Sequence, residues 1–106
     1  MPYEPNAFKV TVIFPKQYPV GSPILASVWN GMTTELRELE SNFTEVPVRG
    51  EWRSEDDDDS RMYFITVSAV GRVQALRDFV ARWRTPFRQQ AMYFDYHPVR
   101  FELVED

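Results

Sequence analysis

The order of hydrophobic periods along this chain of 106 residues constrains its fold more than any other feature. Apolar residues alternate with polar ones over residues 8–14, and this period of two is typical of a half-buried strand. A helical period of three to four follows, then two strand-like segments, a second helical period and a last strand-like segment. Two helices interleaved with four strands predict a single α+β domain over residues 1–106.

The first helical period follows Ser22 and Pro23, which suit the cap and the first position of a helix. We therefore expect a helix from there to about Glu40. Gly31 lies inside it at a cost of about 1 kcal/mol relative to alanine, so we expect a bend or a restart at this point. The apolar stripe of this helix comprises Leu25, Val28, Trp29, Met32, Leu36, Leu39 and Phe43.

Two strands are predicted next, over residues 45–53 and 61–70. The first should place Val46, Val48, Gly50 and Trp52 on one face. In the second, Tyr63, Ile65, Val67 and Ala69 should face one way and Met62, Phe64, Thr66 and Ser68 the other. We expect an acidic, solvated hairpin loop between these strands, with a loose cation site or a docking patch as alternatives. Its acidic run is Asp56, Asp57, Asp58 and Asp59.

The second helix should cover residues 72–84, and Pro86 should end or kink it. The apolar residues that repeat at helical spacing are Val73, Leu76, Phe79, Val80, Trp83 and Phe87. This helix is locally basic. Charge balance within the surface is the simpler interpretation, and an anion-binding patch is the alternative. Its basic residues are Arg72, Arg77, Arg82, Arg84 and Arg88.

The last strand should cover residues 91–104, with an interruption near Pro98. Proline cannot donate a ladder hydrogen bond, so within sheets it is confined to edge strands, strand starts and bulges. Pro47 and Pro98 lie in the second and fourth predicted strands. These are the two edges of the order 4-1-3-2, which we expect in a ferredoxin-like βαββαβ sandwich with both helices on one face of an antiparallel sheet.

Composition excludes several classes of chemistry. The chain has no cysteine, which removes disulfides, thiolate zinc sites and cysteine nucleophiles, and it has one histidine. A net charge of −4 disfavours nucleic-acid binding. The first five residues lack the features of an export signal, and no apolar run approaches a membrane span. We expect a cytoplasmic protein with no cofactor, no metal and no membrane contact.

A cluster of polar and aromatic side chains on the last strand is the nearest approach to a site. Tyr93, Asp95 and His97 should share one face, and side chains of these types can transfer protons. A lone histidine before an edge proline is more often structural, and we predict no catalytic residue. As candidate binding residues we take Tyr93, Tyr96, His97 and Arg100.

Two short motifs resemble a family of small uncharacterised bacterial proteins. One is the segment from Phe43 to the Gly50-x-Trp52 end of the second strand, and the other is the segment from Arg84 through Phe87 to Gln89. That family supplies no established activity. The resemblance adds Trp52 and Gln89 to the candidate binding residues.

With both helices on one side, the other face of the sheet should present Ile13, Met62 and Phe64 among polar residues. Such a face is too apolar for water, and a second copy of the chain is the simplest cover. We expect a non-catalytic interaction or assembly module that forms a homodimer through this face, with a protein partner as a further possibility. The alternative is a small cofactor-free enzyme or ligand binder resembling the dimeric α+β barrels, with an aromatic-lined pocket between sheet and helices.

Overall fold

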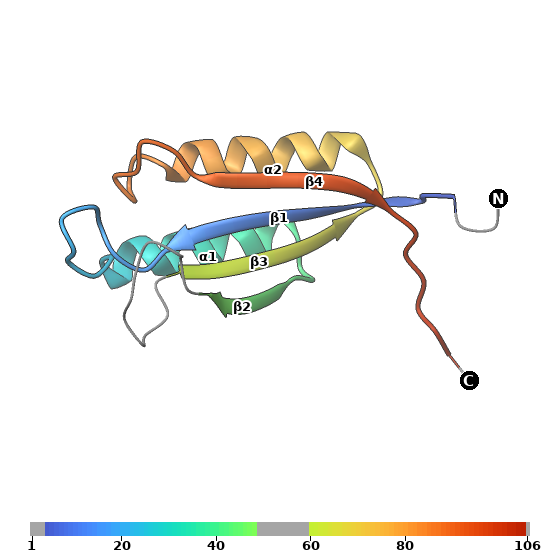
Figure 1. Ribbon diagram of the computed structural model, residues 1–106, viewed down its shortest axis with the longest axis horizontal. Helices are drawn as coiled ribbons and strands as arrows, with labels where there is room; N and C mark the ends of the chain where they lie inside the picture. The colour runs from blue at the N-terminus through green and yellow to red at the C-terminus, as the bar shows by residue number, and fades with distance from the viewer. Residues whose placement is uncertain (1–3, 49–59, 106) are drawn as a thin grey trace.

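The computed structural model describes residues 4–48 and 60–105, which form four strands and two helices (Figure 1). Their order along the chain is the predicted one. The elements are β1 (Ala7–Pro15), α1 (Ala26–Leu39), β2 (Thr44–Val48), β3 (Ser60–Val67), α2 (Val70–Trp83) and β4 (Tyr93–Val99). The prediction of an α+β fold is therefore confirmed.

The four strands form one antiparallel sheet in the order β2-β3-β1-β4. Counted from the β4 edge, this order lists the same neighbours as 4-1-3-2. Pro47 and Pro98 lie on the two edge strands, as predicted. The predicted interruption near Pro98 is wrong, because β4 continues through this residue and Pro98 pairs with Phe8 in the unbroken β1–β4 register. Because Pro98 has no N–H, the peptide groups of this pair do not bond each other, and the nitrogen of Pro98 points to the free edge.

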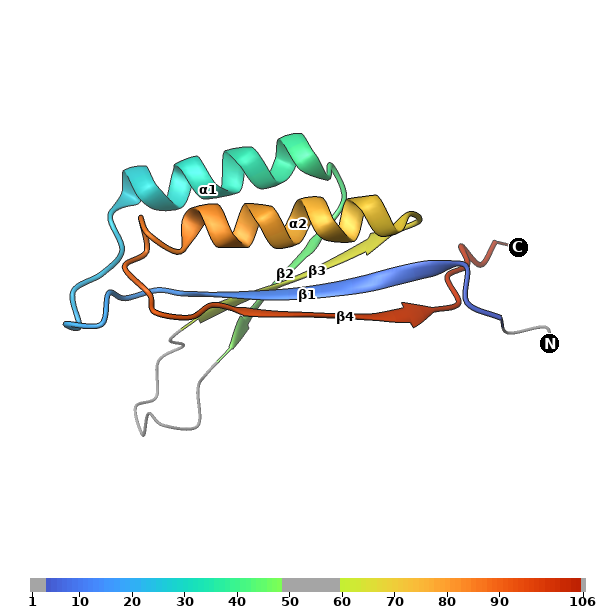
Figure 2. The ribbon, with the colours of Figure 1, turned by 90° about the horizontal axis from the view of Figure 1, so that it is seen from above.

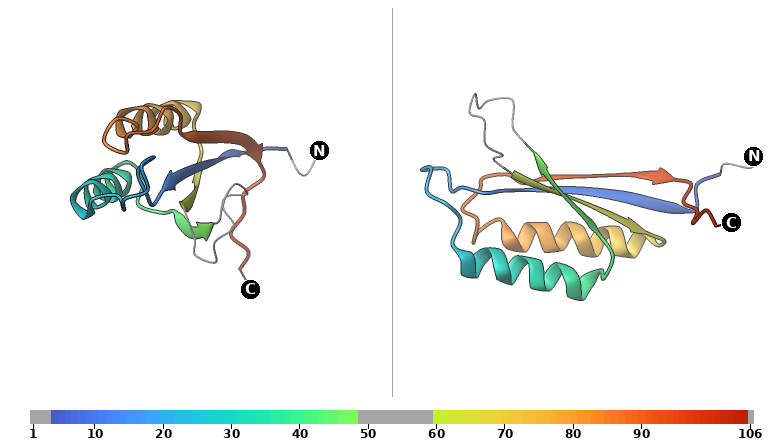
Figure 3. Two further views of the ribbon diagram at one scale, coloured as in Figure 1. Left: turned by 60° about the vertical axis from the view of Figure 1, so that its left-hand side comes forward. Right: turned by 90° about the horizontal axis from the view of Figure 1, so that it is seen from below.

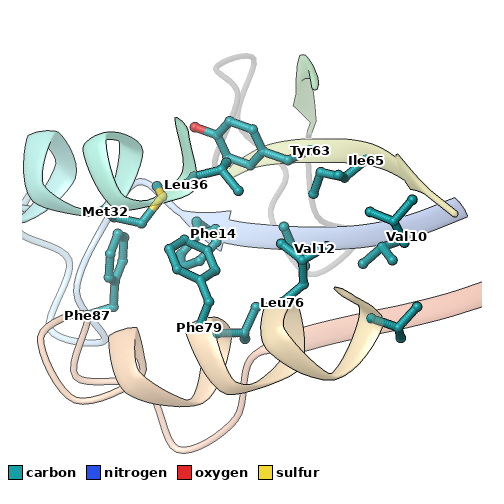
Figure 4. Close-up of a cluster of buried hydrophobic side chains, with 13 residues drawn as sticks. Val10, Val12, Phe14, Met32, Leu36, Tyr63, Ile65, Leu76, Phe79 and Phe87 are labelled. Carbon is teal, nitrogen blue, oxygen red and sulfur yellow. The ribbon is translucent and has the colours of Figure 1, made fainter. Parts of the chain in front are cut away.

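Both helices cover the same face of the sheet and run antiparallel to each other (Figures 2 and 3). Alternation on the central strands directs one set of side chains to the helices, where they are fully buried. On β1 this set includes Val10 and Val12, and on β3 it includes Tyr63 and Ile65. The helices contribute Met32, Leu36, Val73, Leu76, Phe79 and Val80 to the same core (Figure 4).

Phe14 is the centre of an aromatic cluster that joins three parts of the fold. Its ring centroid lies 6.2 Å from that of Tyr63 on β3, 5.9 Å from that of Phe79 on α2 and 5.0 Å from that of Phe87. Phe87 is fully buried although it follows the end of α2. The turn after α2 therefore packs its ring into the core, in addition to ending the helix.

The first helix begins three to four residues later than the sequence predicted. Ser22 and Pro23 belong to the preceding loop, where the Tyr18 N–H donates to the Ser22 carbonyl (2.8 Å) and Pro23 forms an isolated bridge with Gln17. The residue at the helix cap is Leu25, which makes no side-chain capping bond. The predicted cap was wrong because loop closure around buried Tyr18 uses these residues.

The predicted bend at Gly31 is also wrong, because α1 continues through this residue. Gly31 lies against the indole of Trp83 on α2, and a Cβ atom at Gly31 would stand 2.9 Å from the nearest ring carbon. The same indole donates a hydrogen bond to Glu35, which also pairs with Arg82 (2.9 Å). The absence of a side chain at Gly31 therefore leaves room for the Trp83 indole against α1.

Other boundaries differ from prediction by a few residues. β3 ends at Val67, α2 begins at Val70, and β4 ends at Val99 rather than at residue 104. Pro86 lies in the turn after α2, as expected. The end of the second predicted strand, the acidic run from Asp56 to Asp59, and Trp52 all lie outside the described residues.

Replacement of Gly31 by alanine tests the close helix approach. We expect Gly31→Ala to lower the free energy of unfolding by about 1 to 2 kcal/mol, because the clash with a hydrogen-bonded indole outweighs the gain in helix propensity. Gly71→Ala is the matched control: Gly71 lies in the first turn of α2 with open space around it, so alanine should be neutral or stabilising. Urea unfolding measures both. Equal stabilisation by the two variants would contradict the packing role of Gly31.

Candidate functional site

The sheet face opposite the helices carries the clearest surface feature of the molecule. Residues paired across antiparallel strands lie on the same face, so the register assigns side chains to rows that cross the sheet. One row consists entirely of apolar and aromatic residues: Val46 on β2, Met62 on β3, Ile13 on β1 and Tyr93 on β4. We call it the apolar row. No described helix lies over it (Figure 3).

Polar character increases along the same face away from the apolar row. The next row combines Thr44, Phe64, Thr11 and Asp95, and the row after it combines Thr66, Lys9 and His97. The ammonium of Lys9 lies 4.5 Å from the centroid of the Phe64 ring, a cation–π contact between the two rows. We call this whole surface the open face. A row of Pro15, Ser60 and Val48 lies beyond the apolar row, and the pair of Ala7 and Val99 lies beyond the row of Lys9.

Tyr93 and Asp95 interact on the open face, where they share a side of β4 with His97 as predicted. The Tyr93 hydroxyl donates a hydrogen bond to one carboxylate oxygen of Asp95. This bond to an anionic acceptor raises the pKa of Tyr93. The other oxygen, Oδ1, is buried and has no hydrogen-bond partner among the described residues. The pair fixes the orientation of the Tyr93 ring at one end of the apolar row.

The remaining candidate residues lie elsewhere. Tyr96 projects from the helix-covered face of β4, 51% exposed, with its ring centroid 6.2 Å from that of Phe8. Gln89 donates to the carbonyl of Phe87 (2.9 Å) and braces the turn after α2. Arg100 forms an exposed ion pair with Glu102 (3.0 Å). Tyr96 is thus on the opposite side of the sheet from Tyr93 and His97, and the five candidates within the described residues do not converge on one pocket.

Three grooves lie at the margins of the sheet. The largest, about 650 Å³, lies where β1 begins and β3 ends, and Phe43, Phe64 and Phe101 are among its lining residues. The other two, about 560 and 480 Å³, lie between α2 and β4 and share Arg77 and Phe94. His97 lines none of the three. The space between sheet and helices is occupied by core side chains.

The basic residues of α2 have different surroundings. Arg72 donates to Glu40 and to the carbonyl of Leu39 (both 3.0 Å), and Arg82 pairs with Glu35. These two arginines balance charge between the helices, as the simpler interpretation predicted. Arg77 is exposed and has no ion-pair partner among the described residues. Sequence periodicity could not separate these roles because all three positions are exposed on one helix.

Tyr63 carries a buried hydroxyl that sequence reasoning did not identify. The residue is fully buried, and its Oη atom has no hydrogen-bond partner of normal geometry among the described residues. Burial raises the pKa of this phenol strongly, and the neighbouring carboxylate of Glu45 raises it further. The arrangement keeps the phenol protonated. Its surroundings are core side chains and the β2 edge, away from the open face.

Comparison of the sequence with models of known families and with curated proteins finds no match. No helix in the described parts of the chain is long and apolar enough to cross a membrane. Within residues 4–48 and 60–105, no three acidic or histidine side chains are grouped in a way that could hold a metal ion. The open face and the grooves are therefore the candidate sites of function.

Replacement of Tyr63 by phenylalanine tests the buried hydroxyl. At pH 7 we expect Tyr63→Phe to change the free energy of unfolding by less than about 0.5 kcal/mol, because no normal hydrogen bond is lost. Above about pH 10 the unfolded chain releases this proton and the folded protein keeps it, so wild-type stability should fall by up to about 1 kcal/mol per pH unit. The variant should lack this part of the decline.

Urea unfolding from pH 7 to 11 measures both effects. Tyr18→Phe is the control, since the hydroxyl of this second buried tyrosine contacts the Leu25 N–H (3.5 Å) and its loss should cost about 0.5 kcal/mol at pH 7. A loss of more than about 1.5 kcal/mol at pH 7 in Tyr63→Phe would show that its hydroxyl is bonded after all.

Proposed function

We propose that this protein is a non-catalytic interaction module with a ferredoxin-like fold, and that it self-associates through the open face of its sheet. The single observation that carries the proposal is the apolar row of Val46, Met62, Ile13 and Tyr93. A one-sided sheet usually alternates apolar residues inside with polar residues outside. The apolar row crosses all four strands on the outer side and so departs from this alternation. Burial in an interface explains the departure.

A second copy is the occupant that the charges of the open face favour. Among the described strand residues, this face carries one amine, that of Lys9, and one carboxylate, that of Asp95, on neighbouring strands. A two-fold axis lying in the interface exchanges the surfaces of the two copies, so it can set Lys9 of each copy near Asp95 of the other. The apolar rows of the two copies are then covered within the interface, and the polar residues lie beside them.

The dimensions of the open face predict a weak dimer. Strands of about eight residues are about 26 Å long, and four strands span about 19 Å, so the footprint is roughly 500 Å². Standard interfaces bury about 800 Å² per partner, and smaller ones are typical of transient complexes. We therefore propose a dissociation constant in the micromolar range, which corresponds to about −8 kcal/mol or weaker.

The filled interior favours this proposal over a small enzyme or ligand binder of the α+β barrel type. Such an enzyme would need an enclosed void beside His97 or a tyrosine hydroxyl, whereas core side chains fill the interior. Tyr96 lines a groove between α2 and β4, but His97 and Tyr93 line none of the three grooves. Tyr93 and His97 are also separated by the sheet from Tyr96. Residence in the cytoplasm and membership of the uncharacterised bacterial family remain predictions; the absence of cysteine is compatible with a reducing compartment.

Sedimentation equilibrium over about 10 to 500 µM tests the dimer and its location. We expect a monomer–dimer equilibrium in the wild-type protein. Met62→Glu should weaken it at least ten-fold, because the new carboxylate would be buried in the interface without a partner. Thermal unfolding of the variant excludes loss of the fold as the cause.

Thr66→Glu is the matched control. It adds the same charge to the same strand and the same face, but in the polar row that lies four residues away. We expect its effect on dimerisation to be less than about three-fold. A wild-type monomer throughout this concentration range, or equal effects of the two variants, would contradict the proposal.

A further inference from the structure

The two grooves between α2 and β4 form a second surface, separate from the open face. They share Arg77 and Phe94, so they are continuous along the strand. Their apolar lining includes Val73, Val80 and Met92. Arg77 and Arg84 lie two helical turns apart and supply positive charge. Asp95 is the only acidic lining residue of these two grooves, and its carboxylate accepts the Tyr93 hydroxyl. We call this surface the α2–β4 groove.

The free edge of β4 provides peptide groups beside the α2–β4 groove. Hydrogen-bonded and non-hydrogen-bonded pairs alternate along an antiparallel ladder. Phe8 and Pro98 form a non-hydrogen-bonded pair, and the register is unbroken, so Tyr96 and Phe94 also form non-hydrogen-bonded pairs with β1. The N–H and carbonyl groups of Tyr96 and Phe94 therefore point away from β1. β4 has no neighbour on that side among the described residues. An extended segment can pair there as an added strand.

A segment with matching chemistry is present in this chain. Residues 101–105 follow β4 and have the sequence Phe-Glu-Leu-Val-Glu, which combines apolar side chains with negative charge. Leu103 is 76% exposed and Val104 is 92% exposed. Apolar side chains of this size are unlike the usual content of a solvated tail. The arginines of the groove complement the two glutamates.

The segment cannot reach the groove of its own molecule in the observed arrangement. The side chain of Asn6 accepts the Phe101 N–H (2.8 Å) and donates to the Phe101 carbonyl (3.0 Å). These bonds hold the segment on the β1 side of β4, and it then leads away from α2 (Figure 1). A segment from another molecule is required to fill the groove.

We propose that the α2–β4 groove receives residues 101–105 of a second copy as an added edge strand. The backbone of the segment pairs with Phe94 and Tyr96. Side chains alternate along a strand, so the face turned to α2 presents either Glu102 and Val104 or Leu103 and Glu105. In both registers one glutamate meets Arg77 and Arg84, and one apolar side chain packs on the apolar lining. Five residues of strand span about 17 Å, which fits the length of β4. This contact does not involve the apolar row, and it adds a second, tail-mediated mode of self-association to the one proposed above.

A labelled peptide of residues 100–105, with blocked ends, is the probe. Fluorescence anisotropy measures its binding to the full chain carrying Met62→Glu, so that contact through the open face does not contribute. We expect saturable binding that weakens with added salt. The double variant Arg77→Ala/Arg84→Ala should weaken binding about ten-fold. Methylation of alternate peptide nitrogens, in the register that faces β4, should abolish it.

Two controls make the result decisive. Arg72→Ala/Arg82→Ala removes the same charge from the same helix outside the groove, and it should change binding less than about two-fold. A peptide with both glutamates replaced by lysine should bind Arg77→Glu/Arg84→Glu and fail to bind the parent protein. No saturation up to about 1 mM, or equal binding by the groove variant, overturns this proposal and leaves the test of the open-face dimer unaffected.

Discussion

The packing of Phe14 holds the architecture together. This one residue, near the end of a central strand, contacts rings from β3, from α2 and from the turn after α2. Edge-to-face and tilted ring pairs add specific geometry to the burial of apolar area. All of these contacts lie on the side of β1 that the two helices cover. The residues that alternate with the core residues form the opposite face of the sheet. No core packing constrains their side chains, so we relate the composition of this face to function.

Much of the fold could be predicted because its signals are local. The alternation on β1 and β3 assigned Val10, Val12, Tyr63 and Ile65 to the core, and all four are fully buried. The edge positions of Pro47 and Pro98 followed from the missing N–H alone. These predictions needed no knowledge of tertiary contacts.

The predictions that failed depend on contacts between distant segments. Gly31 was expected to disturb α1. Instead it leaves room for the indole of Trp83, which lies 52 positions further along the chain. Ser22 and Pro23 have the character of a helix start, but the loop that closes over Tyr18 uses them instead. Of the apolar row, the sequence predicted only Ile13 and Met62 on the uncovered face. Val46 and Tyr93 join them through the register of the four strands, which no single hydrophobic period reveals. The α2–β4 groove combines residues from two elements, and no sequence period joins them.

The two edge prolines have a consequence for how far the sheet can grow. An exposed strand edge is a template for unlimited stacking of chains, which natural proteins prevent with proline, charge or short strands. The described part of β2 has five residues, and the backbone groups of Glu45 and Pro47 point to its free edge. The missing N–H of Pro47 opposes the pairing of another strand there. At the free edge of β4, Phe94 and Tyr96 offer backbone N–H groups and Pro98 offers none, so only a short strand can pair there. The described sheet thus has one edge that opposes the addition of a strand and one edge that permits it over a short length.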